Sequence, residues 1–393
     1  MISEFFFSST PHIHFGSGKR SELRKLAAGF GKKMVLVTGD NSFDSSDRCR
    51  QLWQELSRNF DIRRVKVSGE PSPQLVDEAV AGYHDFSADC VVAVGGGSAI
   101  DAGKAIAGLL PGGESVMEYL EGVGKGREYC GPSTPFIAVP TTAGTGGETS
   151  KNAVLSVVGE QGFKKSFRHE ALVARHIILD PELTLNCPTD LTAACGMDAL
   201  TQLLESYVSA GANPMTDALA ISGLAMVRDS LLTAVEDGAD INARAGMLYA
   251  SALSGLTLAN AGLGSVHGLA SPLGAFFPLP HGVVCGTLLF EATQTNVIAM
   301  HQRSPDHPSL EKYADAGRLF TRQTSLDSYA AREALLGMLQ AWSGRLKMPR
   351  LSRFGVGEED IDRIVAGSRG NSMQTNPVRL TDQEIAEIVR RRL

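Results

Sequence analysis

Paired cysteines are missing from this sequence. Its six cysteines stand singly, without a CxxC pair or zinc-finger spacing: Cys49, Cys90, Cys130, Cys187, Cys195 and Cys285. This distribution excludes a disulfide framework and a cysteine-rich zinc module. It predicts reduced, mostly buried thiols in a cytoplasmic protein.

Long hydrophobic runs and basic clusters are also missing. No uninterrupted apolar stretch reaches about 18 residues, the length that a membrane span needs. Residues 1–7 are acidic rather than basic and lack a long apolar core, so they do not resemble a signal peptide. The net charge of -6 and the absence of a basic run disfavour nucleic acid as a partner. We therefore expect a protein with neither a membrane nor a nucleic-acid partner.

What the sequence has is enough length for two domains. A chain of 393 residues exceeds the size at which one core keeps growing. Short β-branched runs alternate with helical patterns up to about residue 185, which predicts a doubly wound parallel sheet. Beyond that point apolar-periodic stretches rich in Ala, Leu and Met predict an all-helical domain. The expected domains are residues 1–185 and 186–393.

The individual elements follow from the same periodicities. Strands are predicted at residues 33–38, 90–94, 136–140 and 176–180, with helices at 18–29, 74–86 and 100–110 between them. In the second half, helices are predicted at 215–236, 243–261 and 328–346, no strand is expected, and polar loops are predicted at 301–312 and 366–378.

A glycine-rich turn follows one predicted strand and opens a helix. It consists of Gly95, Gly96, Gly97 and Ser98. Free backbone N–H groups and the helix dipole hold phosphate at such a place, and glycine leaves room for the approach. The turn matches neither GxGxxG nor a Walker sequence, and a tight turn without a ligand is the alternative.

A second loop after a strand carries three threonine hydroxyls, on Thr141, Thr142 and Thr145. Two phosphate-type loops at successive strand ends indicate a dinucleotide lying across the carboxyl edge of the sheet.

Polar side chains in the second half converge by spacing. Asp198, Gln202 and Glu205 recur at i, i+4 and i+7, so they share one face of a leucine-rich helix. His267 and His281 lie downstream in an apolar segment punctuated by glycine and proline. These groups predict a divalent-cation site of oxygen and imidazole ligands. Two alternatives stay open: core histidines bonded to the backbone, and an Asp198 that only stabilises a helix dipole.

With these pieces in order, the chain resembles the iron-containing (group III) alcohol dehydrogenases. The resemblance runs through residues 11–18, 70–73, 95–104, 140–150, 180–183, 280–282 and 375–379. It implies hydride transfer between NAD or NADP and the carbonyl carbon of a small aldehyde or ketone, with the corresponding alcohol as the reduced form. It also implies a divalent metal, Fe²⁺ or Zn²⁺, that polarises the oxygen, and a homodimer or a higher homo-oligomer.

The resemblance places functional residues in both domains. Asp198, His267 and His281 match the metal-ligand positions. Residues that match nucleotide-site positions are Gly96, Gly97, Ser98, Asp101, Thr141, Thr142, Thr145 and Lys164, with Leu183 at a hydrophobic position near the adenosine.

Three departures from the family pattern affect the expected chemistry. The family's usual second metal ligand, a histidine, is Gln202 here, and an amide oxygen is a weaker donor than imidazole. Ser271 stands where many members carry a proton-relaying histidine, and serine is no base near neutrality. Gly39 takes the place of the ribose-binding aspartate, with Asp40 one step later, which makes NADP use possible.

These features support a metal-dependent alcohol dehydrogenase or aldehyde reductase for a small polar substrate. Proton transfer would then use metal-bound water, a ribose hydroxyl or another side chain. A maleylacetate-reductase-like enzyme is the close alternative. From a different class, a nucleotide-binding protein without catalysis is the third.

Overall fold

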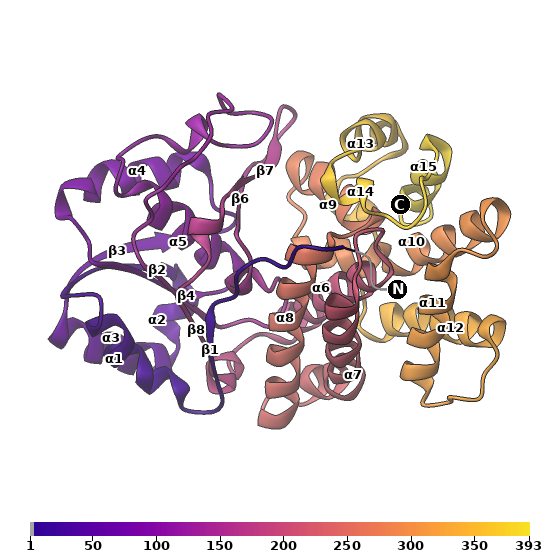
Figure 1. Ribbon diagram of the computed structural model, residues 1–393, viewed down its shortest axis with the longest axis horizontal. Helices are drawn as coiled ribbons and strands as arrows, with labels where there is room; N and C mark the ends of the chain where they lie inside the picture. The colour runs from indigo at the N-terminus through magenta and orange to yellow at the C-terminus, as the bar shows by residue number, and fades with distance from the viewer. Residues whose placement is uncertain (1–3) are drawn as a thin grey trace.

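The computed structural model describes residues 4–393 and has an α/β half followed by a helical half (Figure 1). Residues 1–3, part of the segment compared with a signal peptide, lie outside the described residues. The doubly wound parallel sheet and the helical C-terminal domain that the sequence predicts are both present.

The α/β half is built on a six-stranded sheet in which every pair is parallel, in the order β1-β8-β5-β4-β2-β3. The strands are β1 (His12–Phe15), β2 (Lys33–Gly39), β3 (Asp61–Val67), β4 (Cys90–Gly95), β5 (Phe136–Pro140) and β8 (His176–Leu179). The central strands β4 and β5 are buried along their whole length, as continuous apolar runs in a parallel sheet should be.

Helices cover both faces of this sheet. They are α1 (Leu23–Ala28), α2 (Asn41–Ser45), α3 (Asp47–Asn59), α4 (Pro73–Tyr83) and α5 (Gly97–Leu109). One buried cluster joins the sheet to α4 and α5, and another joins the opposite face to α1 and α3. The strand order reverses between β2 and β4, and ligands of such sheets bind at that switch point.

Four strands were not predicted from the sequence. The edge strands β1 and β3 are largely exposed, and charged residues interrupt β3, so neither reads as a buried apolar run. The other two, β6 (Asn152–Val157) and β7 (Phe163–Arg168), form an antiparallel hairpin of their own. This hairpin reaches towards the helical half (Figure 1).

Helices make up the second half, with no strand after residue 179 among the described residues. They are α6 (Thr189–Val208), α7 (Pro214–Glu236), α8 (Ile241–Ala261), α9 (Ser265–Phe276), α10 (His281–Arg303), α11 (Pro308–Thr321), α12 (Ser328–Arg345), α13 (Ile361–Gly367), α14 (Asn371–Gln374) and α15 (Asp382–Arg390). One large cluster of buried residues forms their common core.

The prediction of a polar loop at 301–312 was wrong at both ends. Helix α10 continues to Arg303, and α11 starts at Pro308, where proline at the first helical position suits the helix. The predicted loop at 366–378 contains the short helix α14. In both segments the polar residues belong to exposed helix faces as well as to loops.

Two helices, α7 and α10, are long and apolar enough to cross a membrane by length and composition alone. Their most apolar windows are 39% and 67% buried inside the fold, respectively. Both contribute side chains to the core of the helical half, and core helices of soluble proteins have the same character.

Candidate functional site

The glycine turn lies at the switch point of the sheet. Gly95 ends β4, and a Cβ there would lie 3.2 Å from the backbone nitrogen of Gly39, the last residue of β2. Gly96 precedes α5, and Gly97 and Ser98 form its first turn. The free N–H groups of this helix start therefore face the carboxyl edge of the sheet, where a phosphate can be held.

The second predicted loop packs directly on this turn. The N–H of Thr141 donates to the carbonyl of Gly95 over 2.9 Å. A Cβ on Gly96 would lie 3.3 Å from Oγ1 of Thr142, and one on Gly97 would lie 2.8 Å from Cγ2 of Thr145. The glycines therefore admit the threonine side chains, and the two loops form one surface.

The same loop also touches the helical half. Gly146 has a φ of +59°, and a Cβ there would lie 2.4 Å from the backbone of Gly255 on α8. Only glycine combines this left-handed conformation with so close an approach. The hydroxyl of Thr149 donates to the carbonyl of Ala252 over 3.2 Å. The loop thus fixes the position of the glycine turn relative to α8.

Buried Lys104 anchors this loop from the other side. Its ammonium, fully buried, donates to the carbonyls of Gly147 and Asn152 over 2.6 Å each, and lies 3.8 Å from Asp101. Burial raises the pKa of Asp101 to about 6. Lys104 therefore braces α5 against the loop and is not available to a phosphate.

A second group of side chains converges in the helical half. Asp198 on α6, His267 on α9 and His281 at the start of α10 meet there. Oδ1 of Asp198 lies 3.4 Å from Nε2 of His267 and 3.7 Å from Nε2 of His281. Cys285, one turn after His281, places its Sγ 3.6 Å from His267 Nε2 and 3.8 Å from His281 Nε2. The donor atoms of these four residues all lie within 4.8 Å of one another.

Small residues bring the helices close enough for this. A Cβ on Gly282 would lie 2.4 Å from the carbonyl oxygen of Ala194, and one on Gly286 would lie 2.9 Å from Cβ of Met197. Both glycines let the backbone of α10 approach α6. That approach carries His281 and Cys285 up to Asp198.

Glu205 holds His267 in position. Its Oε2 lies 2.6 Å from Nδ1 of His267, and its Oε1 accepts a 2.7 Å hydrogen bond from the N–H of Val266. A carboxylate at Nδ1 places the proton there and leaves the lone pair of Nε2 directed at the cluster. Burial disfavours a charged His267, but Cys285 and the carboxylates of Asp198 and Glu205 outweigh burial and raise its pKa well above the usual value. A cation would therefore displace a proton from Nε2 when it binds.

Gln202 directs its amide nitrogen, not its oxygen, towards the cluster. The nitrogen donates to Oδ1 of Asp198 over 3.1 Å, while the oxygen accepts a 2.6 Å hydrogen bond from the hydroxyl of Ser254. An amide N–H carries no free lone pair for a cation. Gln202 therefore lies one hydrogen bond from Asp198, as its i+4 spacing predicts, but it orients the carboxylate.

Burial governs the remaining ionisations in the cluster. It lowers the pKa of His281 to about 4 and raises the pKa of Cys285 to about 12. Nδ1 of His281 is buried and has no hydrogen-bond partner in the described part of the chain. A carboxylate, two imidazoles and a thiol held together in this way are a chemically suitable donor set for a divalent cation.

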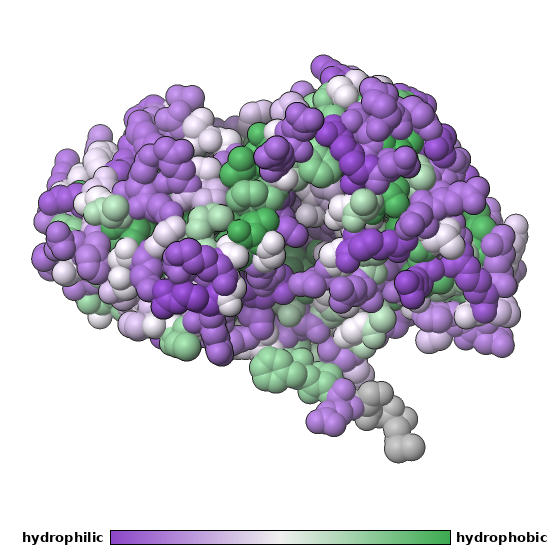
Figure 2. Space-filling model, turned by 90° about the horizontal axis from the view of Figure 1, so that it is seen from above, coloured by the Kyte–Doolittle hydropathy of each residue, from purple (hydrophilic) through white to green (hydrophobic). Residues whose placement is uncertain are grey.

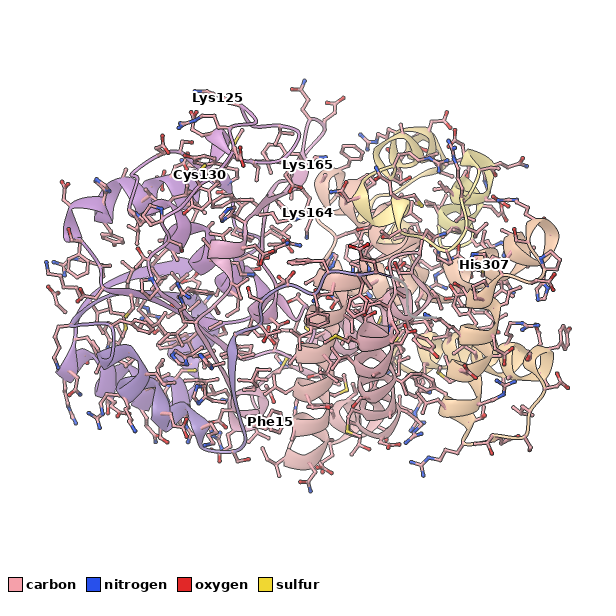
Figure 3. All side chains as sticks on the ribbon, viewed as in Figure 1. Phe15, Lys125, Cys130, Lys164, Lys165 and His307 are labelled. Carbon is pink, nitrogen blue, oxygen red and sulfur yellow. The ribbon has the colours of Figure 1, made fainter. Side chains whose placement is uncertain are left out.

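Ser271 and Lys164 meet at the contact between the domains. The hydroxyl of Ser271, one turn after His267, donates to the backbone carbonyl of Lys164 over 3.3 Å. Lys164 lies on β7, on the side that faces the helical half (Figure 3). Its ammonium lies 3.0 Å from Oε2 of Glu70. Ser271 therefore ties α9 to the hairpin.

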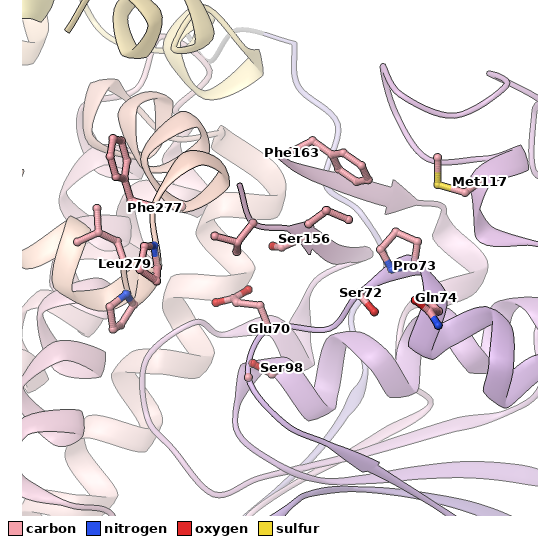
Figure 4. Close-up of a pocket in the computed structure, with 16 residues that line it drawn as sticks. Glu70, Ser72, Pro73, Gln74, Ser98, Met117, Ser156, Phe163, Phe277 and Leu279 are labelled. Carbon is pink, nitrogen blue, oxygen red and sulfur yellow. The ribbon is translucent and has the colours of Figure 1, made fainter. Parts of the chain in front are cut away.

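A cleft of about 900 Å³ lies between the two halves. Ser98 of the glycine turn and Glu70 line its base, while Phe163 and Phe277 stand on opposite walls (Figure 4). Pro280, the residue before His281, also lines it. Apolar side chains gather along the line between the two halves (Figure 2). The cleft thus reaches from the first turn of α5 to the residue that precedes His281.

Three other predicted nucleotide-site residues, Asp40, Asp101 and Leu183, are not among the residues that line that cleft. Asp40 follows β2 and precedes α2, at the switch point. Asp101 faces Lys104 and Gly147 behind the turn. Leu183 is 4% exposed and packs in the core cluster of α1 and α3.

Sequence reasoning gave no site role to Cys285, Glu70 or Lys104. The signal for Cys285 is its spacing, because i+4 from His281 puts both side chains on one helix face. For Glu70 and Lys104 the partners lie on other elements, and no local pattern reveals them.

Known proteins give the context for this geometry. Residues 10–181 match the family model "iron-containing alcohol dehydrogenase", and residues 192–393 match that of the family's C-terminal domain. The chain is 31% identical over 401 residues to an NAD-dependent methanol dehydrogenase of Bacillus methanolicus, with both chains fully covered. It is 35% identical over 370 residues to a 1,3-propanediol dehydrogenase of Klebsiella pneumoniae, covering 92% of this chain and 91% of the other. A crystal structure of a 1,3-propanediol oxidoreductase superposes with a TM-score of 0.90 at 31% identity, with both chains fully covered.

Proposed function

Because the chain belongs to the iron-containing alcohol dehydrogenase family, we propose that it is an NAD- or NADP-linked oxidoreductase that interconverts a small alcohol and its aldehyde or ketone. The cleft is the observation that carries this proposal. It is lined at one side by Ser98 of the glycine turn and at the other by Pro280 beside the cluster. The reactive end of the nucleotide and the polarising centre would both open onto this cavity, as carbonyl reduction requires.

The described residues fit both groups that the family implies. Asp198, His267 and His281 would hold a divalent metal, which supplies Lewis-acid polarisation of the substrate oxygen. The turn at 95–98 and the threonines packed on it would hold the nucleotide, which supplies or accepts the hydride. The chain's own part is to orient both groups and to exclude water from the cleft between Phe163 and Phe277.

The reacting substrate is small. About 900 Å³ must accommodate the nicotinamide end of the nucleotide as well as the substrate, and the walls are mainly apolar. Glu70 and Lys164 form an ion pair beside this space. We propose that they bind polar groups of the substrate or of the nicotinamide, in agreement with a small polar alcohol.

The choice between NAD and NADP depends on residues at the switch point. Gly39 presents no carboxylate that would repel a 2′-phosphate, whereas Asp40 next to it can accept from ribose hydroxyls. On the neighbouring strand β3, Arg64 and Lys66 form ion pairs with Asp44 at 2.8 and 2.7 Å. Both nucleotides fit this pattern, and the ratio of kcat/KM with NADH and NADPH measures the preference.

Three further properties belong to the same proposal. The two domains divide at residues 185 and 186, between the last sheet strand and α6. The enzyme forms a homodimer or a higher homo-oligomer, for which the exposed apolar residues Ile13 and Phe15 on edge strand β1 offer a surface. It works in the cytoplasm, in agreement with its free cysteines. Light scattering of the purified protein tests the oligomeric state.

Reconstitution tests the function. The protein is stripped of metal, reloaded with Fe²⁺ or Zn²⁺, and assayed for oxidation of NADH and NADPH with a series of short aldehydes. We expect turnover that depends on added metal and is lost in Asp198→Asn. Tight nucleotide binding without turnover on any carbonyl compound would favour a nucleotide-binding protein without catalysis. Turnover only on an unsaturated keto acid would favour the maleylacetate-reductase-like alternative.

A further inference from the structure

Cys285 lies in the candidate metal centre at a position suited to ligation. It is fully buried on α10, one turn after His281, and its Sγ lies 3.6 Å from His267 Nε2 and 3.8 Å from His281 Nε2. Asp198 Oδ1 lies 3.4 and 3.7 Å from the same two nitrogens. The thiol and the carboxylate therefore face the same pair of imidazoles.

Four of the six donor separations match the edges of a coordination tetrahedron, to which the substrate oxygen would add as a fifth ligand. An ion with nitrogen, oxygen and sulfur bonds of about 2.0–2.3 Å at tetrahedral angles separates its donors by roughly 3.3–3.6 Å. The four measured separations, 3.4 to 3.8 Å, need only a slight contraction around an ion. In the absence of an ion, the same distances suit weak hydrogen bonds between the thiol and the two imidazoles, so metal loading would replace these bonds with ligand bonds.

Gln202, at the family's histidine position, cannot serve as the fourth ligand in the orientation that its side chain has here. Gln202 donates its amide N–H to Asp198 and uses its oxygen to accept from Ser254. In this orientation of the amide, Asp198 is the donor that α6 directs at the cation. Cys285 approaches from α10 and fills the gap in the donor set.

We propose that the thiolate of Cys285 is the fourth protein ligand of the metal centre, in place of the imidazole that Gln202 lacks, and that it strengthens the preference of the centre for Zn²⁺ over Fe²⁺. This inference rests on the proposed function, because it assigns a ligand to the same centre. When the metal enters, the S–H bond breaks, the proton leaves to solvent and a sulfur–metal bond forms, without any change of oxidation state.

The proposed donor set changes the charge and softness of the centre. Asp198 and Cys285 together contribute two negative charges, which neutralise a divalent cation. Thiolate is a soft ligand, and soft ligands favour zinc over ferrous iron relative to a set of carboxylate and imidazoles alone. The imidazole of His267 stays oriented, because Glu205 contacts its Nδ1.

X-ray absorption of the zinc-loaded wild-type protein tests the ligand directly. We expect one sulfur scatterer at about 2.3 Å among nitrogen and oxygen scatterers. The cobalt-loaded protein should show a sulfur-to-cobalt charge-transfer band that disappears in Cys285→Ala and in Cys285→Ser. The matched control is Cys49→Ala, a buried cysteine in the other domain, which should keep the band. The wild-type measurement needs no variant, so misfolding of a variant does not affect it.

The metal preference is measured by competitive loading with equal Zn²⁺ and Fe²⁺ under anaerobic conditions. We expect the zinc-to-iron ratio to fall about tenfold in Cys285→Ser, because a serine oxygen is a harder donor than thiolate and does not favour the softer ion. Bound metal with only nitrogen and oxygen scatterers, or an unchanged ratio in Cys285→Ser, would overturn the proposal. Failure of the proposed function is a separate result: a sulfur-ligated metal in a protein that reduces no carbonyl compound.

Discussion

Glu205 offers the sharpest test of how the cluster is positioned. The two carboxylate oxygens of Glu205 have separate partners: one accepts from the N–H of Val266, and the other lies 2.6 Å from Nδ1 of His267. The glutamine of Glu205→Gln has only one oxygen, so it cannot accept from both partners. If the new amide oxygen keeps the bond to Val266, its NH₂ group faces Nδ1. The imidazole can then accept there only if its proton moves to Nε2.

A proton on Nε2 removes the lone pair that the cluster needs. We therefore expect Glu205→Gln to bind Zn²⁺ roughly 10- to 100-fold more weakly, the usual cost of altering a residue that orients a metal ligand. The free energy of unfolding should fall by only about 1–3 kcal/mol, because the substitution weakens one buried hydrogen bond and keeps the shape of the side chain. Turnover should fall in parallel with metal occupancy.

Two measurements check this expectation. Competition with a coloured chelator gives the zinc affinity, and nitrogen NMR of labelled histidine reports which ring nitrogen of His267 carries the proton. Glu148→Gln, which also neutralises a buried carboxyl group but lies outside the cluster, is the matched control and should keep the wild-type affinity. An unchanged zinc affinity in Glu205→Gln would refute the positioning role of Glu205.

The remaining predictions concern the loops of the α/β half. Gly97→Ala should weaken the binding of NADH and NADPH in fluorescence titrations, and the loss should persist when Thr145→Ser also removes the methyl group that lies 2.8 Å from the new Cβ. Full recovery of affinity in the double variant would mean that the alanine disturbed only the packing of the loop. Lys104→Met should lower the free energy of unfolding by about 3–5 kcal/mol in denaturant melts, because it leaves the carbonyls of Gly147 and Asn152 unpaired and removes a buried charge near Asp101. A loss of less than about 1 kcal/mol would contradict the role of Lys104 in bracing the loop. Burial raises the pKa of Glu148 from 4.5 to about 7, so the folded state binds this proton more tightly than the unfolded state, and the free energy of unfolding should fall by up to about 3 kcal/mol as pH rises from 4.5 to 7. Denaturant melts of wild type and Glu148→Gln should diverge over that pH range, and parallel curves would contradict the raised pKa of Glu148.

Much of the fold could be predicted because its central elements have simple patterns. The strands at 33–38, 90–94 and 136–140 are continuous apolar runs, and such runs form only where both faces of a sheet are covered. The edge strand β3 escaped prediction because only its two valines are buried, while Arg63, Arg64 and Lys66 point to solvent or to ion pairs. Edge strands tolerate charge, so their hydropathy pattern is weak.

The metal cluster could be predicted only in part. Spacing on α6 brings Asp198 and Gln202 to one face, and His267 and His281 stand out as polar residues in an apolar segment punctuated by glycine and proline. The direction of the Gln202 amide could not be predicted, because it depends on Ser254, which lies 52 residues away in sequence. Cys285 carried the right spacing from His281, but a buried cysteine in an apolar helix usually serves packing.

Deuterium transfer tests the central claim most directly. The zinc-loaded protein is incubated with NADH or NADPH carrying deuterium at the C4 position of the nicotinamide and with a short aldehyde, and the alcohol product is analysed by mass spectrometry. We predict deuterium on the former carbonyl carbon when the isotope occupies the face of the ring that reacts, and no product from Asp198→Asn. Absence of labelled alcohol with either face labelled, from protein that demonstrably holds both zinc and nucleotide, would contradict the assignment as an alcohol dehydrogenase or aldehyde reductase.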